Sequence, residues 1–293
     1  MTEDLVTAFD LLSLDPRVKC IVITGHGRMF CAGADLDTGL NYKEDTVLTH
    51  RDGGGRVALA IHRCNKPTIS AINGSAVGVG ITCKYKYLLF PTHPHRLFLS
   101  PPFPSNNHPV TLPTSIRLVS STAKIGFVFS RRGIIMEACS SYFLPRLIGL
   151  SRAIHLTTTG STYPSTSPLL SNLFSEILPP EQVLPRALEI ASDIAQNTSL
   201  VSTKVMRDLM WRGPATVEET HLLDSRVLLE LFGGEDKKEG VASFLEKRDP
   251  EFKANMLENA PSAWPWWKQV DTKPPMTVEE AMKRVEDRAK AKL

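Results

Sequence analysis

The sequence predicts an α/β fold with strands concentrated in the first half of the chain and helices in the second. Two short apolar segments rich in β-branched residues, 18–24 and 67–72, have the length and composition of buried strands. Each is followed by a loop of small residues, at 31–36 and 73–80. Because α/β folds place ligands just beyond the carboxyl ends of such strands, we expect the two loops to border one site.

Helical periodicity accounts for much of the remaining chain. Residues 2–14 place apolar side chains at helical spacing after a threonine suited to an N-cap. Segment 38–55 is polar and ends in a run of glycines, which predicts a loop. The other predicted helices cover residues 56–64, 151–157, 179–196, 203–211 and 218–232. This order of elements favours a β-rich core covered by helices.

Length and composition fit an enzyme with one substantial core. The chain has 293 residues, of which 42% are hydrophobic and 22% are charged. Its net charge of +3 is too small to indicate a nucleic-acid partner. No apolar run reaches the ~18 residues that a membrane span requires. The five cysteines lack the paired spacing of a metal site, so we expect reduced thiols and no metal ligands.

Four sequence blocks resemble the crotonase, or enoyl-CoA hydratase/isomerase, superfamily. In family order they are Cys-Ala-Gly-Ala-Asp-Leu (31–36), Lys-Pro-Thr-Ile-Ser-Ala-Ile-Asn-Gly (66–74), Glu-Ala-Cys-Ser-Ser-Tyr-Phe-Leu-Pro-Arg (137–146) and Glu-Gly-Val-Ala-Ser-Phe-Leu-Glu-Lys-Arg (239–248). The resemblance implies a spiral core of repeated β-β-α units with a C-terminal helical region. It also implies an acyl-CoA substrate, with coenzyme A entering as part of that substrate and no separate cofactor.

The resemblance assigns an oxyanion hole to the two small-residue loops. In the family the first loop donates from the residue before the aspartate, here Ala34, and the second from the middle of a glycine triplet, here Val79. Valine breaks the triplet, but any non-proline residue still carries the backbone N–H. Two converging N–H groups stabilise an oxyanion. The neighbouring residues expected to contact substrate are Ala32, Gly33, Asp35, Leu36 and Gly78.

The acids present decide which reaction the resemblance implies. Enoyl-CoA hydratases hold one water between two glutamates, and the corresponding positions here carry Thr82 and Phe129, which cannot take a proton from water. Glu137 instead matches the segment that supplies the single catalytic glutamate of peroxisomal 3,2-enoyl-CoA isomerases. One carboxylate is enough to shift a double bond. The alternatives are a structural acid at the start of the following helix and a hydratase with rearranged acids.

The C-terminal region gives two further expectations. Lys247 lies in the block similar to the family's C-terminal helix, whose basic end lies near coenzyme A, often that of a neighbouring subunit. We therefore expect Lys247 to bind substrate in a homotrimer or hexamer. Trp264, Trp266 and Trp267 form an aromatic cluster that we expect to anchor this region by hydrophobic packing. The alternatives are the lining of an acyl channel and a subunit contact.

The chain ends in Ala291-Lys292-Leu293, a variant of the Ser-Lys-Leu peroxisomal signal. It predicts a peroxisomal location and an import receptor as partner. The alternative is an ordinary basic helix end. Together with the resemblance, it predicts an enzyme of fungal type that acts on acyl chains in fatty-acid or secondary-metabolite, including toxin, metabolism.

Two departures from the family pattern affect the domain organisation. The β-hairpin that usually precedes the first helix is missing, which predicts a shortened chain or a misassigned start. Segment 84–110 interrupts the pattern, and its 27 residues hold six of the chain's 21 prolines and three of its eight histidines. We expect no regular structure there. The predicted regions are a spiral core over 1–200 with this insert, a helical region over 201–275 and a basic tail over 276–293.

Segment 84–110 also has the features of a retained intron. Cys83-Lys84-Tyr85 can be encoded with the splice-donor consensus GTAAGT, Ser105-Asn106 with the branch consensus CTAAC, and Pro109-Val110 with the acceptor CAG. All three signals occur in the required order. The alternative for this segment is a genuine surface insertion. For the function of the chain, a further alternative is an inactive product that is unspliced and N-terminally shortened.

If the segment is a retained intron, the source should contain a major transcript that lacks codons 84–110. Splicing would join the first base of codon 83 to the last two bases of codon 110, so position 83 should encode Leu or Phe. Sequencing of complementary DNA measures this directly. If every transcript keeps these codons in frame, the segment is a genuine insertion.

Overall fold

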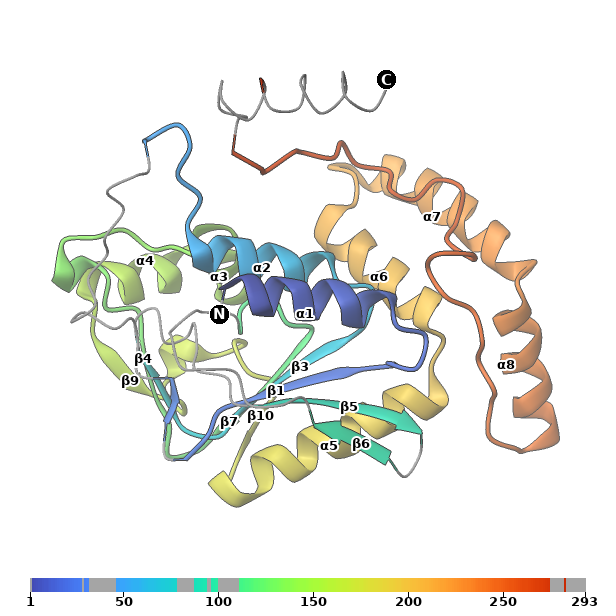
Figure 1. Cartoon of the computed structure of the whole chain (residues 1–293), viewed down its shortest axis with the longest axis horizontal. Coiled ribbons are helices and arrows are strands. Elements are labelled where there is room, and N and C mark those ends of the chain that lie inside the picture. Colours follow the sequence, from blue (N-terminus) through green and yellow to red (C-terminus); the bar gives the residue numbers. More distant parts are fainter. Residues whose placement is uncertain are drawn as a thin grey trace.

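The structure is a computed structural model that describes residues 2–27, 29–31, 46–77, 87–93, 96–99, 111–274 and 282. Its larger sheet has the strand order β10-β7-β3-β1-β5-β6, and its smaller sheet has the order β2-β4-β8-β9. Helices cover the sheets, and a helical region extends to one side (Figure 1). The mixed α/β architecture with mainly parallel pairing confirms the fold class predicted from the sequence.

Parallel strands form the centre of the larger sheet. They are β1 (Ile21–Thr24), β3 (Thr68–Ile72), β7 (Ile116–Ser120) and β10 (Glu176–Leu178). Every residue of β1 and β3 is buried. This burial explains why these strands are continuous apolar runs, since a parallel sheet is covered on both faces.

Side chains of β1 alternate between two hydrophobic cores. Ile21 and Ile23 belong to the main core, with α1 (Thr2–Leu14) and α2 (Gly53–Arg63). Val22 belongs to a second core under α5 (Pro180–Asn197). The period of two along a strand thus places helices on opposite faces of the sheet.

The smaller sheet contains the strands that directly precede residues 32 and 78 in the chain. Its strands β2 (Met29–Cys31), β4 (Ser75–Val77) and β8 (Lys124–Gly126) are parallel, and β9 (Thr162–Pro164) is antiparallel to β8. Cys31 pairs with Ala76. The carboxyl ends of β2 and β4 are therefore neighbours at one edge of this sheet.

The second half of the chain is mainly helical. After the short 3-10 helix Ser130–Arg132 come α3 (Ser140–Ile148), α4 (Leu150–Thr159), α6 (Leu200–Arg212), α7 (Val217–Phe232) and α8 (Glu235–Glu246). A small core around Val201, Val205 and Val227 joins α6 and α7 to the segment that contains Trp264 and Trp266. Anchoring by these tryptophans is confirmed. Within the described ranges, no helix has the length and apolar character needed to cross a membrane.

Two predicted features differ from the structure. The glycines at 53–55 form the first turn of α2 rather than the end of a loop, because the Asp52 side chain caps the helix by accepting from the Gly55 N–H. Segment 84–110, where we expected no regular structure, contributes β5 (Tyr87–His93) and β6 (Arg96–Leu99), which pair antiparallel with each other. Pro91 lies beyond the part of β5 that pairs with β1, and it stands opposite Leu97 of β6 just before that ladder shifts register.

Candidate active site

Glu137 lies in a strained turn just before α3. The next two residues, Ala138 and Cys139, have φ values of +55° and +56°. Left-handed conformations cost non-glycine residues about 1–2 kcal/mol each. The Ser140 backbone N–H and hydroxyl both donate to the Glu137 carbonyl oxygen, at 2.9 and 2.5 Å. Strain of this kind persists only where surrounding contacts hold it.

Asp52 supplies one of those contacts. It is the N-cap of α2, and its Oδ2 accepts from the Gly55 N–H at 2.5 Å and from the Ala138 N–H at 3.1 Å. A Cβ atom on Gly55 would lie 2.6 Å from Oδ1 of Asp52, so any larger residue at this position would force the carboxylate to shift. One carboxylate therefore joins the start of α2 to the turn beside Glu137.

The surroundings of Glu137 raise its pKa to about 7. Burial of the carboxyl group is the larger cause, and the negative charge of Asp52 is the second. A carboxyl group that titrates near neutral pH can accept and return a proton at little cost, which is the property a general base needs. The raised pKa also argues against the alternative that a helix N-terminus stabilises the Glu137 carboxylate, because that interaction would lower the pKa.

Apolar residues account for the burial of Glu137. Met136 packs against the main core, and Ala138 and Phe143 belong to it. The N-cap of α3 is Cys139, and no side chain makes its capping hydrogen bond. The interpretation of Glu137 as a helix-capping acid therefore has no support in this geometry.

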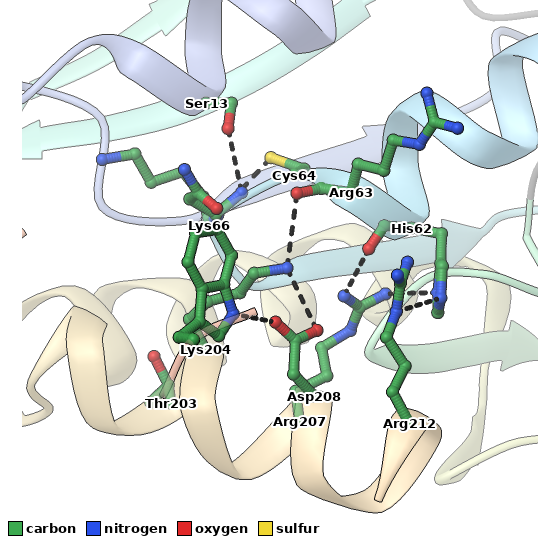
Figure 2. A network of polar contacts seen from close by, with 12 residues as sticks. Ser13, His62, Arg63, Cys64, Lys66, Thr203, Lys204, Arg207, Asp208 and Arg212 are labelled. Carbon is green, nitrogen blue, oxygen red and sulfur yellow. Dashed lines mark hydrogen bonds and ion pairs between the residues drawn. The ribbon is translucent and has the colours of Figure 1, made fainter. Parts of the chain in front are cut away.

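The other end of α2 is fixed by a buried polar network, shown in Figure 2. Lys204 Nζ donates to the Arg63 carbonyl oxygen at 3.3 Å, and an Arg207 nitrogen donates to the His62 carbonyl oxygen at 2.8 Å. These are C-terminal carbonyls of α2, which lack partners within the helix. Lys204 also pairs with Asp208 at 3.2 Å. Cations from α6 thus satisfy the negative end of α2.

His62 stays neutral within this network. Burial lowers its pKa to about 3, and the charges of Arg207 and Arg212 act in the same direction. Its ring makes edge contacts with Phe143 of α3 and Trp211 of α6. The neutral ring therefore packs α2 against the helix that follows Glu137.

Many of the residues that the sequence assigned to the site lie outside the described residues. This group comprises Ala32, Gly33, Ala34, Asp35, Leu36, Gly78 and Val79, with Thr82. The strands that lead to the two loops are described, and they are adjacent and parallel. Their geometry agrees with loops that leave the same sheet edge, while the oxyanion hole itself stays a prediction.

Of the other residues that the sequence assigned to a function, the structure describes some and does not describe the rest. Phe129 is buried in the main core, so an apolar ring occupies that hydratase position. Lys247 is the exposed C-cap of α8, which lies well away from α3 in Figure 1. Within one chain, Lys247 and Glu137 do not come together. The targeting residues Ala291, Lys292 and Leu293 lie outside the part of the chain that the structure describes.

A pocket of about 490 Å³ lies beside the end of β4. Arg131 donates from its side chain to the Thr159 carbonyl oxygen at 2.9 Å and to the Ser161 hydroxyl at 2.7 Å, which fixes its guanidinium group. The pocket is lined by Val77, Val128, Arg131, Arg132, Gly160 and Thr162. It presents two cationic side chains next to the strand that leads into the second loop.

Asp52 is the residue beside Glu137 that the sequence analysis missed. The pattern that could have indicated it is an acidic N-cap directly before a helix, but the three following glycines favoured a loop. Its contact with Ala138 links positions 86 residues apart. No local pattern predicts such a contact.

Comparison with known proteins adds to this geometry. A family model described as enoyl-CoA hydratase/isomerase matches residues 1–85 and 108–255. Enoyl-CoA hydratase AFT3-1 of Alternaria alternata is 48% identical over 89% of this chain and 79% of its own length. Enoyl-CoA hydratase ACTT3 of the same organism has the same identity and coverage. A probable enoyl-CoA hydratase of Bacillus subtilis is 28% identical over 86% of this chain and 88% of its own length.

Solved structures show the same fold. A probable enoyl-CoA hydratase/isomerase from Mycobacterium abscessus superposes with a TM-score of 0.68 at 26% identity, over 86% of this chain and 88% of that one. A putative enoyl-CoA hydratase from Streptomyces coelicolor gives a TM-score of 0.68 at 25% identity, over 86% of this chain and 83% of that one. The family match omits residues 86–107, which lie within the interruption identified from the sequence.

The raised pKa of Glu137 predicts that Glu137→Gln stabilises the protein more at pH 8 than at pH 5. The folded pKa of about 7 exceeds the ordinary glutamate pKa of 4.5, so the carboxyl group favours folding below pH 4.5 and loses that contribution as pH rises through 7. Gln mimics the protonated form at every pH. Allowing for partial solvent exposure, we expect an additional gain of about 1–2 kcal/mol at pH 8.

Urea unfolding of both proteins at the two pH values measures this gain. Glu218→Gln, at an exposed position on α7, is the matched control and should show no such increase. An equal effect of Glu137→Gln at pH 5 and pH 8 would contradict the prediction.

Proposed function

This chain belongs to the enoyl-CoA hydratase/isomerase family, and from that premise we propose that it converts a 3-enoyl-CoA to a 2-enoyl-CoA with Glu137 as the base. The observation that carries the proposal is one carboxyl group in an apolar turn, with its pKa raised to about 7. A base that must release its proton again works best when its pKa lies near the working pH. The buried ring of Phe129 supports a single-base reaction over the two-glutamate arrangement.

The proposed reaction needs no group beyond the substrate and the protein. The Glu137 carboxylate takes a proton from C2, and the electron pair of that C–H bond moves toward the thioester oxygen to form a dienolate. Backbone N–H groups of Ala34 and Val79 stabilise the negative oxygen in this proposal. Protonated Glu137 then returns the proton to C4, which leaves the double bond between C2 and C3.

A second candidate function is hydration of a 2-enoyl-CoA. Two observations favour it: Asp52 is a second carboxylate beside Glu137, and similar proteins are named enoyl-CoA hydratases. In this reaction one carboxylate takes a proton from water as the hydroxyl adds to C3, and the other, protonated, carboxyl donates to C2. This is the hydratase with rearranged acids that the sequence left open.

Other parts of the chain support an acyl-CoA enzyme of several subunits. The guanidinium groups of Arg131 and Arg132 beside β4 offer a place for coenzyme A phosphates.

Leu229 of α7 is 73% exposed and Phe244 of α8 is 81% exposed, which favours contact with further copies of this chain. A homotrimer or hexamer would place Lys247 against a neighbouring subunit's substrate. We place the reaction in fatty-acid or toxin-related acyl-chain metabolism in the peroxisome.

The proposal predicts that Glu137→Gln lowers the conversion of 3-enoyl-CoA at least about a hundredfold, because Gln keeps the size of the side chain but removes the base. The change in ultraviolet absorbance as the double bond becomes conjugated with the thioester measures this rate. The full chain and a version without 84–110 are both assayed, since that segment follows the proposed donor Val79 by a few residues.

Glu218→Gln serves again as the matched control and should retain activity. Binding of coenzyme A should change little in Glu137→Gln, because the side chain is proposed to face C2 and C4 of the acyl chain. Retained isomerase activity in this variant would exclude Glu137 as the base. Fast addition of water to 2-enoyl-CoA by the parent protein would establish the second candidate instead.

The tail predicts peroxisomal import. A fluorescent protein that ends in the last twelve residues, 282–293, should appear in puncta with a peroxisomal marker, because the receptor reads a free C-terminal tripeptide. The same fusion without Leu293 is the control and should be diffuse. A diffuse signal from the intact tail would remove the peroxisomal assignment.

A further inference from the structure

We propose that Asp52 is a positioning residue for Glu137: its carboxylate holds the Ala138 N–H and thereby maintains the left-handed turn that orients the base. The inference rests on the proposed role of Glu137 and extends it to a residue on another element. The hydrogen bond of 3.1 Å from the Ala138 N–H to Asp52 Oδ2 joins the turn to α2. We call this contact the Asp52 clamp.

The conformation of the turn explains why a clamp is needed. Ala138 and Cys139 are both left-handed, and neither is glycine. Each would relax toward an ordinary backbone conformation if the turn were free, and that rotation would change the direction of Glu137. A hydrogen bond to a charged acceptor is among the stronger restraints available to a backbone N–H.

The position of Asp52 is itself fixed. Its Oδ2 accepts from the Gly55 N–H at 2.5 Å, as the N-cap of α2. The far end of α2 is held by Lys204 and Arg207, through the carbonyl oxygens of Arg63 and His62. The clamp therefore connects the turn to a helix that is restrained at both ends.

The Asp52 carboxylate also acts on Glu137 through its charge. Among the described residues, the charged group that raises the pKa of Glu137 is Asp52 of α2, in addition to burial. Cys139 follows in the chain, and its pKa is raised by burial and by Asp52, while Arg63 acts on this thiol in the opposite direction. Asp52 thus has two separable effects, one geometric and one electrostatic.

An N-cap role alone does not account for this arrangement. A capping side chain needs only to reach the N–H groups of its own helix. Asp52 makes that contact and in addition accepts from Ala138, 86 residues along the chain. Gly55 leaves the space that the carboxylate occupies, since a Cβ there would lie 2.6 Å from it.

Two substitutions in the full chain separate the effects. Asp52→Asn keeps an oxygen that accepts from both N–H groups but removes the charge. Asp52→Ser keeps a helix cap but is too short to hold Ala138 as well. Thr216→Ala is the matched control, since Thr216 caps α7 by accepting from the Glu219 N–H at 3.2 Å, away from the turn.

The first readout is hydrogen exchange of the Ala138 amide, measured by NMR. Hydrogen exchange should be at least about tenfold faster in Asp52→Ser, because losing one hydrogen bond to a charged group favours the open, exchanging state by about that factor. It should stay close to the parent rate in Asp52→Asn and in Thr216→Ala. An unchanged Ala138 rate in Asp52→Ser would overturn the clamp.

The second readout is the titration of Glu137, followed by ¹³C NMR with the signal identified by its loss in Glu137→Gln. The titration should move to lower pH in Asp52→Asn, because removal of a negative neighbour makes ionisation easier. It should not move in Thr216→Ala. An unchanged midpoint in Asp52→Asn would overturn the electrostatic part of the proposal.

The third readout is catalysis, tested on 3-enoyl-CoA. Asp52→Ser should lower kcat about 10- to 100-fold with little change in KM, because a displaced base affects the reaction more than binding. Asp52→Asn should recover most of the maximal rate, with the acid limb of its pH profile shifted to lower pH. A Ser variant with the parent kcat would show that the turn does not position the base.

The exchange and titration readouts do not depend on activity. If Glu137→Gln remained active, the proposed function would fail while these two measurements still decided whether Asp52 holds the turn. If the function held and both measurements were unchanged, only the inference about Asp52 would fail.

Discussion

The contact between the buried cations of α6 and the C-terminal carbonyls of α2 is the constraint on which the candidate site depends. Lys204 and Asp208 form an ion pair with side chains that are 3% and 0% exposed, and Lys204 and Arg207 both bind carbonyl oxygens of α2. Breaking such a buried pair by removal of one partner costs about 3–5 kcal/mol. Trp264 donates to the other oxygen of Asp208 at 2.8 Å, which joins the C-terminal segment to the same point.

Anchoring at one end of α2 has consequences at the other end. The helix has 11 residues, so it spans about 16 Å from the polar network to Asp52. Its hydrogen-bonded backbone is stiff, so fixing one end also limits the movement of the other. Asp52 can therefore hold a strained turn that a carboxylate on a loose loop would not hold. The stability needed for the strain at Ala138 and Cys139 comes from packing elsewhere in the fold, including the contacts of His62 with Phe143 and Trp211.

The sequence could predict the elements whose signal is local. The β-branched runs indicated β1 and β3, and helical periodicity indicated α1, α5, α6 and α7, with ends within a few residues of those observed. Glu137 was identified as the candidate base by its resemblance to family motifs. The cause of its raised pKa is mainly burial, which only the fold reveals. The Asp52 clamp could not be predicted, because it joins distant parts of the chain and because Gly53 and its neighbours favoured a loop. The strands β5 and β6 were hidden by the prolines around them.

The hydrogen bonds of Asp52 also bear on the two candidate reactions. One of its oxygens is already occupied by two backbone N–H groups, from Gly55 and Ala138. A hydratase needs both of its carboxyl groups free to bind one water and to exchange protons with it. An isomerase needs one such group, and a second carboxylate fixed beside it serves by raising the pKa of the first. The two acids are therefore unequal in their contacts, and this inequality supports the proposal that Glu137 is a single base and that Asp52 does not itself exchange protons with the substrate.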